Sequence, residues 1–288
     1  MQNMERETNI STNRLYHYTD TSKKLIDILR NGFKPKYSLE KLGTIKKDEL
    51  IDIIAKELNK KIEEENITDE FAIPMCCFCD IPLNLINEHV KVYGNYSIGL
   101  KKEWGERNAI CPVFYVPKGG NTRYLFELIM LQTNRLLPQL QMKYERIQQI
   151  PVDRRNTENE LLTFYLLKYL DSAINLIMYI KPYIGFYERK HFGYTNENYK
   201  FYDEREWRFI PNKKYLERQF LTKEEYENPT VLFEANKTLG NIDFKKEDIA
   251  NIIVPEDEVI YIREELSKIE RLKGIEMTKV NSIGKIIR

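Results

Sequence analysis

Residues 203–210 read Asp-Glu-Arg-Glu-Trp-Arg-Phe-Ile, a short stretch of charged and aromatic residues. Its alternation predicts a β-strand, with Glu204 and Glu206 on one face and the two aromatic residues on the other. Two carboxylates on one strand face repel each other, so the pair adds little to folding. The same pair suits a site that meets a cationic or oxocarbenium-like centre. A solvated strand is the alternative, because Glu-x-Glu recurs by chance in a chain with 44 acidic residues.

A second segment, near the N-terminus, joins a predicted strand to a predicted helix. Leu15–Thr19 is rich in the aromatic and β-branched residues that favour strands. Asp20 or Thr21 suits the N-cap of the following helix, and Asn31-Gly32 is a typical C-terminal stop. His17 therefore lies near the point where a strand turns directly into a helix, which makes it the strongest candidate among three histidines. A packed or surface histidine is the ordinary alternative.

The middle of the chain holds a cluster of cysteines in a predicted buried strand, namely Cys76, Cys77 and Cys79. Their spacing differs from the paired ligands of structural zinc sites, even with His89 as a fourth ligand. Free cysteine packs as a small hydrophobic residue, so we interpret these side chains as core residues and predict no metal site. A metal-dependent nuclease that uses Asp80, Asp203 and Glu206 is an alternative that no ligand spacing favours.

Five motifs follow one another in a recognisable order. They are His17-Tyr-Thr19, Cys77-Phe-Cys-Asp-Ile-Pro82, His89-x3-Tyr-Gly-x-Tyr-x-Ile-Gly-Leu-x-Lys-x-Trp104, Pro112-Val-x-Tyr-Val116 and Asp203-Glu-Arg-Glu-Trp-Arg208. As an ordered set they resemble the AbiGi-type abortive phage-resistance proteins. The segments that carry the resemblance are Leu15–Leu29, Ile73–Val116 and Phe201–Pro211. The resemblance implies antiphage defence, and that group has been labelled the antitoxin half of a two-gene unit, which implies a toxin partner.

A more distant likeness concerns chemistry. A histidine in a His-x-Thr turn after the first strand, with a late glutamate on a strand, is similar to the His–Tyr–Glu pattern of ADP-ribosyltransferases. The likeness implies that His17, Tyr18 and Thr19 bind NAD. It also implies that Glu206 is the catalytic carboxylate and that Glu204 orients the acceptor, a protein or nucleic acid.

The stacking residue of that pattern has two candidates, Tyr93 and Tyr96, one of which would lie on the nicotinamide of NAD. Cleavage of the nicotinamide–ribose bond passes through an oxocarbenium-like state, as in glycoside cleavage. One well-placed carboxylate can stabilise such a state without a metal ion. Cys79 departs from the pattern, because many relatives of that fold carry serine or threonine at this point.

Composition limits the choice of partners and setting. Hydrophobic residues make up 42% of the 288 residues, which is sufficient for a core, and the net charge of +1 gives no bulk attraction to nucleic acid. The clustered cysteines, without a signal peptide, predict a reducing cytoplasm. Leu161–Ile180 is the longest apolar stretch, but charged residues interrupt it. We therefore expect a buried helix there and no membrane contact.

Several boundaries can be predicted from local signals. Cys111–Val116 is a predicted strand, and Thr157-Glu-Asn-Glu160 is a predicted capping box for the last helix of a helical block. Towards the C-terminus, Ile252–Val254 is a predicted strand. A helix should then run from Pro255 through Leu272, followed by a strand at Ile275–Val280.

We thus expect a single α+β domain over residues 1–288, with a mostly antiparallel split sheet of ADP-ribosyltransferase type. Helical insertions are expected at about 39–66 and 124–182, and a strand–helix–strand segment at about 250–284. The predicted function is that of an antiphage effector that cleaves NAD and modifies a macromolecule. The alternative is a catalytically inactive antitoxin or immunity component that binds a toxin through the helical block.

Overall fold

The computed structural model describes the residues 12–41, 70–189, 193–212, 216 and 218–286. The chain divides into two compact units. The first comprises Met1–Leu39, Ala72–Val113 and Ile184–Arg288, and the second comprises Glu40–Phe71 and Phe114–Tyr183. The second unit contains both stretches for which the sequence predicts helical insertions. Of these, residues 42–66 lie outside the described part, and the preceding Lys36–Lys41 forms a strand, β2.

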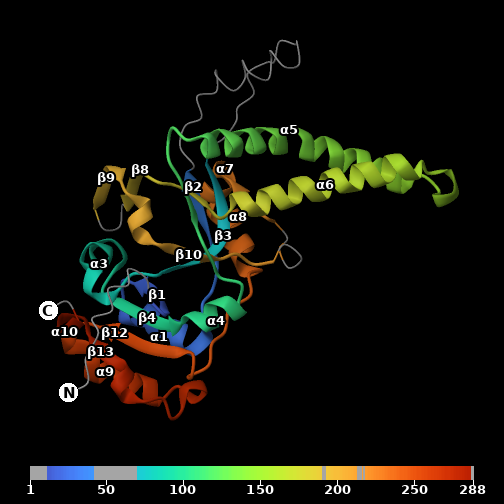
Figure 1. Cartoon of the computed structure of the whole chain (residues 1–288). Coiled ribbons are helices and arrows are strands. Elements are labelled where there is room, and N and C mark those ends of the chain that lie inside the picture. Colours follow the sequence, from blue (N-terminus) through green and yellow to red (C-terminus); the bar gives the residue numbers. More distant parts are fainter. Residues whose placement is uncertain (1–11, 42–69, 190–192, 213–215, 217, 287–288) are drawn as a thin grey trace, which may run out of the picture. The chain divides into compact units, whose positions relative to one another are not determined.

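One mixed sheet organises the first unit (Figure 1), and its described strands run in the order β13-β12-β4-β1-β3-β10-β5, with β2 and β11 also paired to β3. These strands are β1 Arg14–Thr19, β2, β3 Glu70–Cys79, β4 Tyr96–Lys101, β5 Cys111–Pro112, β10 Glu206–Phe209, β11 Leu221–Thr222, β12 Ile249–Val254 and β13 Val280–Ser282. The pairing of β12 with β13 is parallel, whereas β1, β3, β4, β5, β10 and β12 pair antiparallel along the path. The expected α+β class with a mostly antiparallel sheet is therefore confirmed.

Short helices and one hairpin complete the first unit. The α-helices are α1 Ser22–Asn31, α3 Asn87–Tyr93, α4 Lys102–Arg107, α7 Lys223–Glu227, α8 Pro229–Lys237, α9 Val259–Ser267 and α10 Ile283–Ile286. The 3-10 helices are η1 Leu83–Leu85, η4 Phe201–Glu204, η6 Glu256–Glu258, η7 Glu270–Leu272 and η8 Met277–Lys279. The hairpin consists of β8 Gly185–Arg189 and β9 Tyr194–Tyr199.

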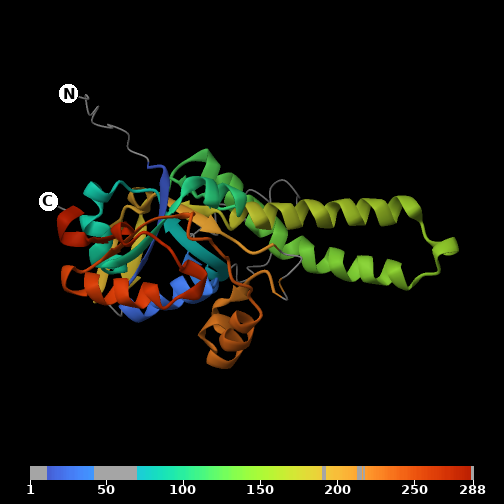
Figure 2. The same cartoon turned by 90° about the horizontal axis from the view of Figure 1, so that it is seen from below.

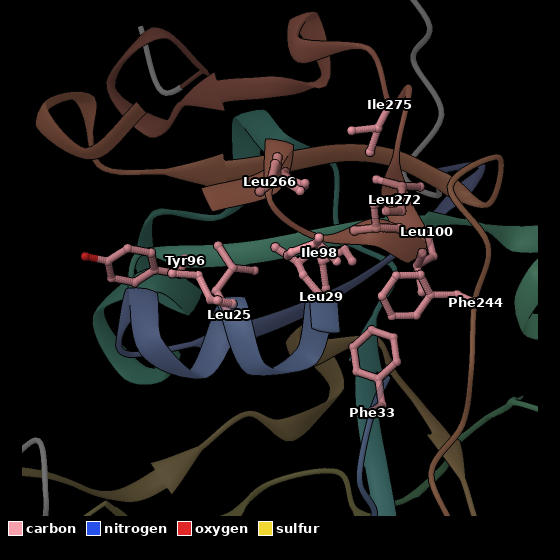
Figure 3. Close-up of a cluster of buried hydrophobic side chains, with 14 of the residues drawn as sticks. Leu25, Leu29, Phe33, Tyr96, Ile98, Leu100, Phe244, Leu266, Leu272 and Ile275 are labelled. Atoms are coloured by element: carbon pink, nitrogen blue, oxygen red, sulfur yellow. The ribbon is translucent and has the colours of Figure 1, made fainter. Parts of the chain in front are cut away.

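The main hydrophobic core lies against one face of the sheet, which we call the core face. Leu25 and Leu29 of α1 and Leu266 of α9 point toward Ile98 and Leu100 of β4 (Figure 3). All five side chains are at most 1% exposed. Each such side chain stabilises the fold by about 1.5–3 kcal/mol relative to its exposed state. The amphipathic pattern of α1 thus explains why this helix covers the sheet.

The caps of α1 follow the sequence prediction. The Thr21 hydroxyl accepts a hydrogen bond from the Lys24 N–H at 3.3 Å, and Gly32 ends the helix at a φ of 80°. A Cβ atom at Gly32 would lie 2.6 Å from the Ile242 carbonyl oxygen, so only glycine fits this close approach.

Removal of the N-cap should destabilise the protein modestly. We expect Thr21→Ala to lower the free energy of unfolding by about 1 kcal/mol, because a helix N–H loses its acceptor. Urea unfolding followed by circular dichroism measures the change. Thr122→Ala, at an exposed threonine that lies in the first turn of another helix and makes no capping bond within the described residues, is the matched control and should change stability by less than half as much. Equal losses in the two variants would contradict a capping role.

The predicted strand at residues 203–210 is only partly correct. Phe201–Glu204 forms η4, Arg205 adopts a left-handed conformation with a φ of 46°, and only Glu206–Phe209 is strand β10. The buried Phe201 ring packs on Tyr187 and Tyr199 at centroid distances of 5.5 and 5.0 Å. This packing holds the start of the segment in a turn, so Glu204 does not share a strand with Glu206.

Other boundaries also differ from the prediction. Cys111–Val116 is divided at Val113, because β5 pairs with β10 whereas β6 (Phe114–Val116) pairs with β7 (Ile180–Pro182). The cap of the last helix of the block is Asn156, whose side chain accepts from the Asn159 N–H at 3.0 Å. An asparagine one residue earlier thus replaces the predicted threonine of the capping box.

The C-terminal segment begins as predicted with β12, but the rest differs. The expected continuous helix from Pro255 through Leu272 is broken into η6, α9 and η7. The expected strand at Ile275–Val280 is wrong, because Met277–Lys279 forms η8 and β13 begins at Val280. Ile275 lies in a loop, but its side chain is buried in the hydrophobic core. A buried loop residue of this kind gives the sequence the apolar pattern of a strand.

Two long helices dominate the described residues of the second unit. They are α5 Asn121–Gln149 and α6 Thr157–Ile177, which pack side by side and run in opposite directions (Figures 1 and 2). The expectation that Leu161–Ile180 is a buried helix is only half correct, because Tyr165 and Tyr169 are 63% and 61% exposed. Within the described ranges, no helix combines the length and apolar character needed to cross a membrane.

Candidate functional site

The register between neighbouring strands determines which predicted site residues lie on the same face of the sheet. Tyr16 of β1 and Glu206 of β10 are both paired with Cys79 of β3. Directly paired residues point to the same face of a sheet, whereas successive residues of one strand alternate. Glu206 therefore lies on the face opposite the core face, which we call the second face, whereas His17, next to Tyr16, lies on the core face.

The remaining predicted residues divide between the two faces in the same way. On the second face, or bonded to residues there, are Tyr18, Tyr93, Glu204 and Glu206. On the core face are His17, Thr19 and Tyr96. The Tyr96 hydroxyl donates to Glu258, whereas the Tyr93 hydroxyl donates to Glu204. The structure thus brings four of the seven residues together and separates the other three from them.

His17 is packed among aromatic rings. Its centroid lies 5.2 Å from that of Phe33 and 5.6 Å from that of Phe78. Nδ1 is 2.8 Å from the Cys77 carbonyl oxygen, which can only accept, so Nδ1 carries the proton. Burial lowers the pKa of His17 below its usual value of 6.5, although the bond to Cys77 opposes the shift. His17 is therefore neutral at pH 7, and its Nδ1–H donates to the main chain of β3.

Glu206 forms a buried ion pair with Arg208, two residues along the same strand face. The Arg208 Nε lies 2.6 Å from Glu206 Oε1, and the two side chains are 0% and 6% exposed. Arg208 was not among the predicted site residues, although its spacing from Glu206 places both on one face. The guanidinium neutralises much of the charge that a catalytic carboxylate would direct at a substrate.

Glu204 is the second buried carboxylate, with a 3% exposed side chain. It accepts a hydrogen bond from the Tyr93 hydroxyl, which in turn accepts from the Tyr187 hydroxyl at 3.1 Å. Burial, followed by the charge of Glu204, raises the pKa of Tyr93 well above its usual value of 10. Tyr93 therefore stays protonated and acts as a hydrogen-bond donor.

The Tyr93 ring is also contacted by two nitrogen-bearing side chains. His89 stacks on it at a centroid distance of 4.3 Å, and the Arg189 guanidinium lies 4.9 Å from its centroid. Arg189 belongs to the β8–β9 hairpin, as does Tyr187. No local pattern connects this hairpin with the motif that contains His89 and Tyr93, because the contact joins residues far apart in the chain.

Arg205 joins the two glutamates in a conformation that non-glycine residues rarely adopt. Its φ and ψ are 46° and 48°, which costs roughly 1–2 kcal/mol for a residue with a Cβ atom. The Asp80 N–H donates to the Arg205 carbonyl oxygen at 3.1 Å, and the Asp80 carboxylate pairs with Lys102 at 2.7 Å. Strain of this kind is frequent at functional sites.

The bond between Tyr93 and Glu204 can be tested directly. We expect Tyr93→Phe to lower the free energy of unfolding by about 1–3 kcal/mol, because the buried carboxylate loses a donor. Chemical unfolding measures the difference. Tyr165→Phe removes a hydroxyl from an exposed ring and is the matched control. If both variants match the wild type, the hydroxyl contributes nothing to the stability of the second face.

Among the residues that the structure describes, no three His, Cys, Asp or Glu side chains lie close enough together to hold a metal ion. Each of the three acids of the nuclease alternative pairs with a cation: Asp80 with Lys102, Asp203 with Lys200 and Glu206 with Arg208. All four cysteines are free. Burial raises the pKa of Cys76 to about 12, as suits a core residue.

Comparison with known proteins places the chain in a class of phage-defence proteins. Residues 48–255 match a family described as "Putative abortive phage resistance protein AbiGi, antitoxin". The chain therefore belongs to the AbiGi family. It is 29% identical over 238 residues to the abortive phage resistance protein AbiGi of Lactococcus lactis subsp. cremoris, across 79% of this chain and 85% of that protein. No solved structure matches.

Proposed function

We propose that this chain is the partner-binding, antitoxin component of an abortive phage-resistance unit, and that it holds a toxin protein through α6. The family description supports an antitoxin, and the notable feature of the described second unit is the surface of this helix. The observation that carries the proposal is that α6 is apolar on two sides, of which only one is covered by α5.

The covered side of α6 explains how the two helices pack. Thr163, Leu170, Ile174 and Ile177 are buried, and Leu167 is half-buried. Their spacing of three or four residues places them on one side of the helix. This is the inner stripe, and it suffices to hold α6 on α5.

The second apolar side is not needed for that packing. It consists of Leu162, Tyr165, Leu166, Tyr169 and Leu176, which are between 42% and 63% exposed. We call these five residues the outer stripe. Contiguous exposed apolar surface of this kind marks interaction sites, and tyrosine is prominent among the residues that carry binding energy. A solvated helix would instead carry charged side chains there.

The second candidate function is that of an ADP-ribosyltransferase. In that case the sheet is of the ADP-ribosyltransferase type, and NAD is the substrate. Its support is two buried carboxylates joined by the strained Arg205: Glu204, which accepts from Tyr93, and Glu206. Two observations weigh against it: His17 lies on the other face of the sheet, and Glu206 is neutralised by Arg208. The geometry therefore favours the antitoxin.

Phage challenge of cells that carry the whole defence locus tests the antitoxin proposal. Tyr165→Glu combined with Tyr169→Glu should disrupt the phenotype, either as lost protection or as growth arrest without phage, because the toxin is released. Phe233→Glu places the same charge on another exposed aromatic residue and should behave as wild type. Wild-type behaviour of the outer-stripe variant would refute the proposal.

Nicotinamide release from NAD by the purified protein tests the second candidate. Release that is present in the wild type and absent when Glu206 is replaced in a folded variant would establish the transferase. Labelled NAD would then identify the acceptor, whether protein or nucleic acid. If no release occurs with or without cell extract, the antitoxin proposal stands alone.

A further inference from the structure

A basic hollow on α5 lies near the end of the helix that is joined to α6. Its lining residues are Gln139, Met142, Lys143, Arg146, Ile147 and Ile150. Lys143 and Arg146 are exposed, and neither forms an ion pair within the described part of the chain. Two such exposed cations, beside apolar side chains, are available to pair with carboxylates of a bound protein.

The helix geometry places this hollow on the same side as the outer stripe. Tyr144 and Ile147 face α6, and Lys143 and Arg146 each precede one of them by a single residue. Residues of the outer stripe likewise precede inner-stripe residues by one, as Tyr169 precedes Leu170. In an antiparallel pair, the residue just before a contact residue lies on the same side of the pair in both helices. Lys143 and Arg146 are therefore on the side of the outer stripe.

Two contacts show which residues of α5 and α6 lie opposite each other along the helix axes. Gln148 donates to Glu160 at 2.8 Å, and the rings of Tyr144 and Phe164 are 6.2 Å apart. This alignment sets Arg146 level with Leu162 and Lys143 level with Tyr165. Phe164 follows Thr163, so its contact with Tyr144 lies on the other side of the pair.

We propose that the toxin segment bound by α6 is an amphipathic helix with acidic residues along the edge that faces α5; this rests on the proposed function. Leu162, Tyr165 and Tyr169 follow the spacing of three and four residues into which the apolar residues of a second helix fit. A helix laid on them runs beside Lys143 and Arg146, which pair with carboxylates and set its position.

Glu158 defines the direction of that helix. It is an exposed acid four residues before Leu162, so it lies at the end of the outer stripe. The bound helix therefore carries a basic residue at this end and acidic residues next to Lys143 and Arg146. This pattern distinguishes one orientation of the partner from the reverse.

Photocrosslinking in cells that carry the defence locus tests this inference. The full chain is produced with a photoreactive benzophenone amino acid in place of Tyr165, and the crosslinked segment is identified by mass spectrometry. We expect an amphipathic helical segment of another protein with acidic residues along one edge. A crosslink to a second copy of this chain, to a basic or non-helical segment, or to nothing would overturn the inference.

Charge reversal separates failure of the inference from failure of the proposed function. Lys143→Glu with Arg146→Glu should lower the crosslink yield at least fivefold and disrupt the phage phenotype. Lys168→Glu is the matched control, because Lys168 lies over Phe164 on the other side of the pair. If the outer-stripe glutamates disrupt the phenotype but Lys143→Glu with Arg146→Glu does not, the antitoxin function stands and the acidic helix is wrong.

Discussion

Replacement of Arg208 by methionine is expected to lower the free energy of unfolding by about 3–5 kcal/mol. Arg208 is fully buried, and its Nε lies 2.6 Å from the carboxylate of Glu206, which is also buried. Without the guanidinium, that carboxylate keeps its desolvation cost and loses this counter-charge. Calorimetry or urea unfolding of the purified variant measures the loss.

The double variant Glu206→Gln with Arg208→Met should regain much of that stability. Removal of both charges also removes the desolvation penalty, and neutral replacements of buried ion pairs are often well tolerated. The comparison matters for enzymology, because Glu206→Gln alone removes a carboxylate partner of the buried Arg208 guanidinium and could lose activity by unfolding. A double variant no more stable than Arg208→Met would show that the two side chains do not act as a pair.

Local signals in the sequence were sufficient to predict individual elements of the sheet. The strand at Leu15–Thr19 and the caps of α1 follow from side-chain chemistry within a few residues of each other. The cysteine strand is similar, because small apolar residues without turn signals favour a buried strand. Cys76 and Cys79 indeed face opposite sides of the sheet and join different clusters.

The arrangement of the candidate site could not be predicted in the same way. Alternation shows which residues share a face within one strand, but the match between strands depends on register. Tyr16, Cys79 and Glu206 lie in one row because β1 and β10 both pair with β3, far apart in the chain. A register shifted by one residue would have placed His17 in that row.

Two further features left no clear signal in the sequence. Left-handed conformations favour glycine, so an arginine at position 205 gives no warning that a predicted strand stops there. The outer stripe of α6 is as apolar as the inner stripe, and hydrophobicity alone cannot tell a covered surface from one that awaits a partner. Only the packing of α5 separates the two.

Alanine substitutions at two adjacent residues of α6 should therefore have different effects on the stability of the protein. Leu170 is 4% exposed and belongs to the inner stripe, so Leu170→Ala should lower the free energy of unfolding by about 2–5 kcal/mol. Tyr169 is 61% exposed, and Tyr169→Ala should change it by no more than about 0.5 kcal/mol. Thermal unfolding of the two purified variants measures this contrast.

Binding should show the opposite order. If Tyr169 is a central contact of the toxin, Tyr169→Ala should weaken the complex by about 2 kcal/mol, roughly thirtyfold, and disrupt the phage phenotype without loss of folded protein. Leu170→Ala should disrupt the phenotype only as far as it lowers the amount of folded protein. Should Tyr169→Ala instead destabilise the chain as much as Leu170→Ala, the outer stripe is part of the folded core, and the toxin must dock on a different surface.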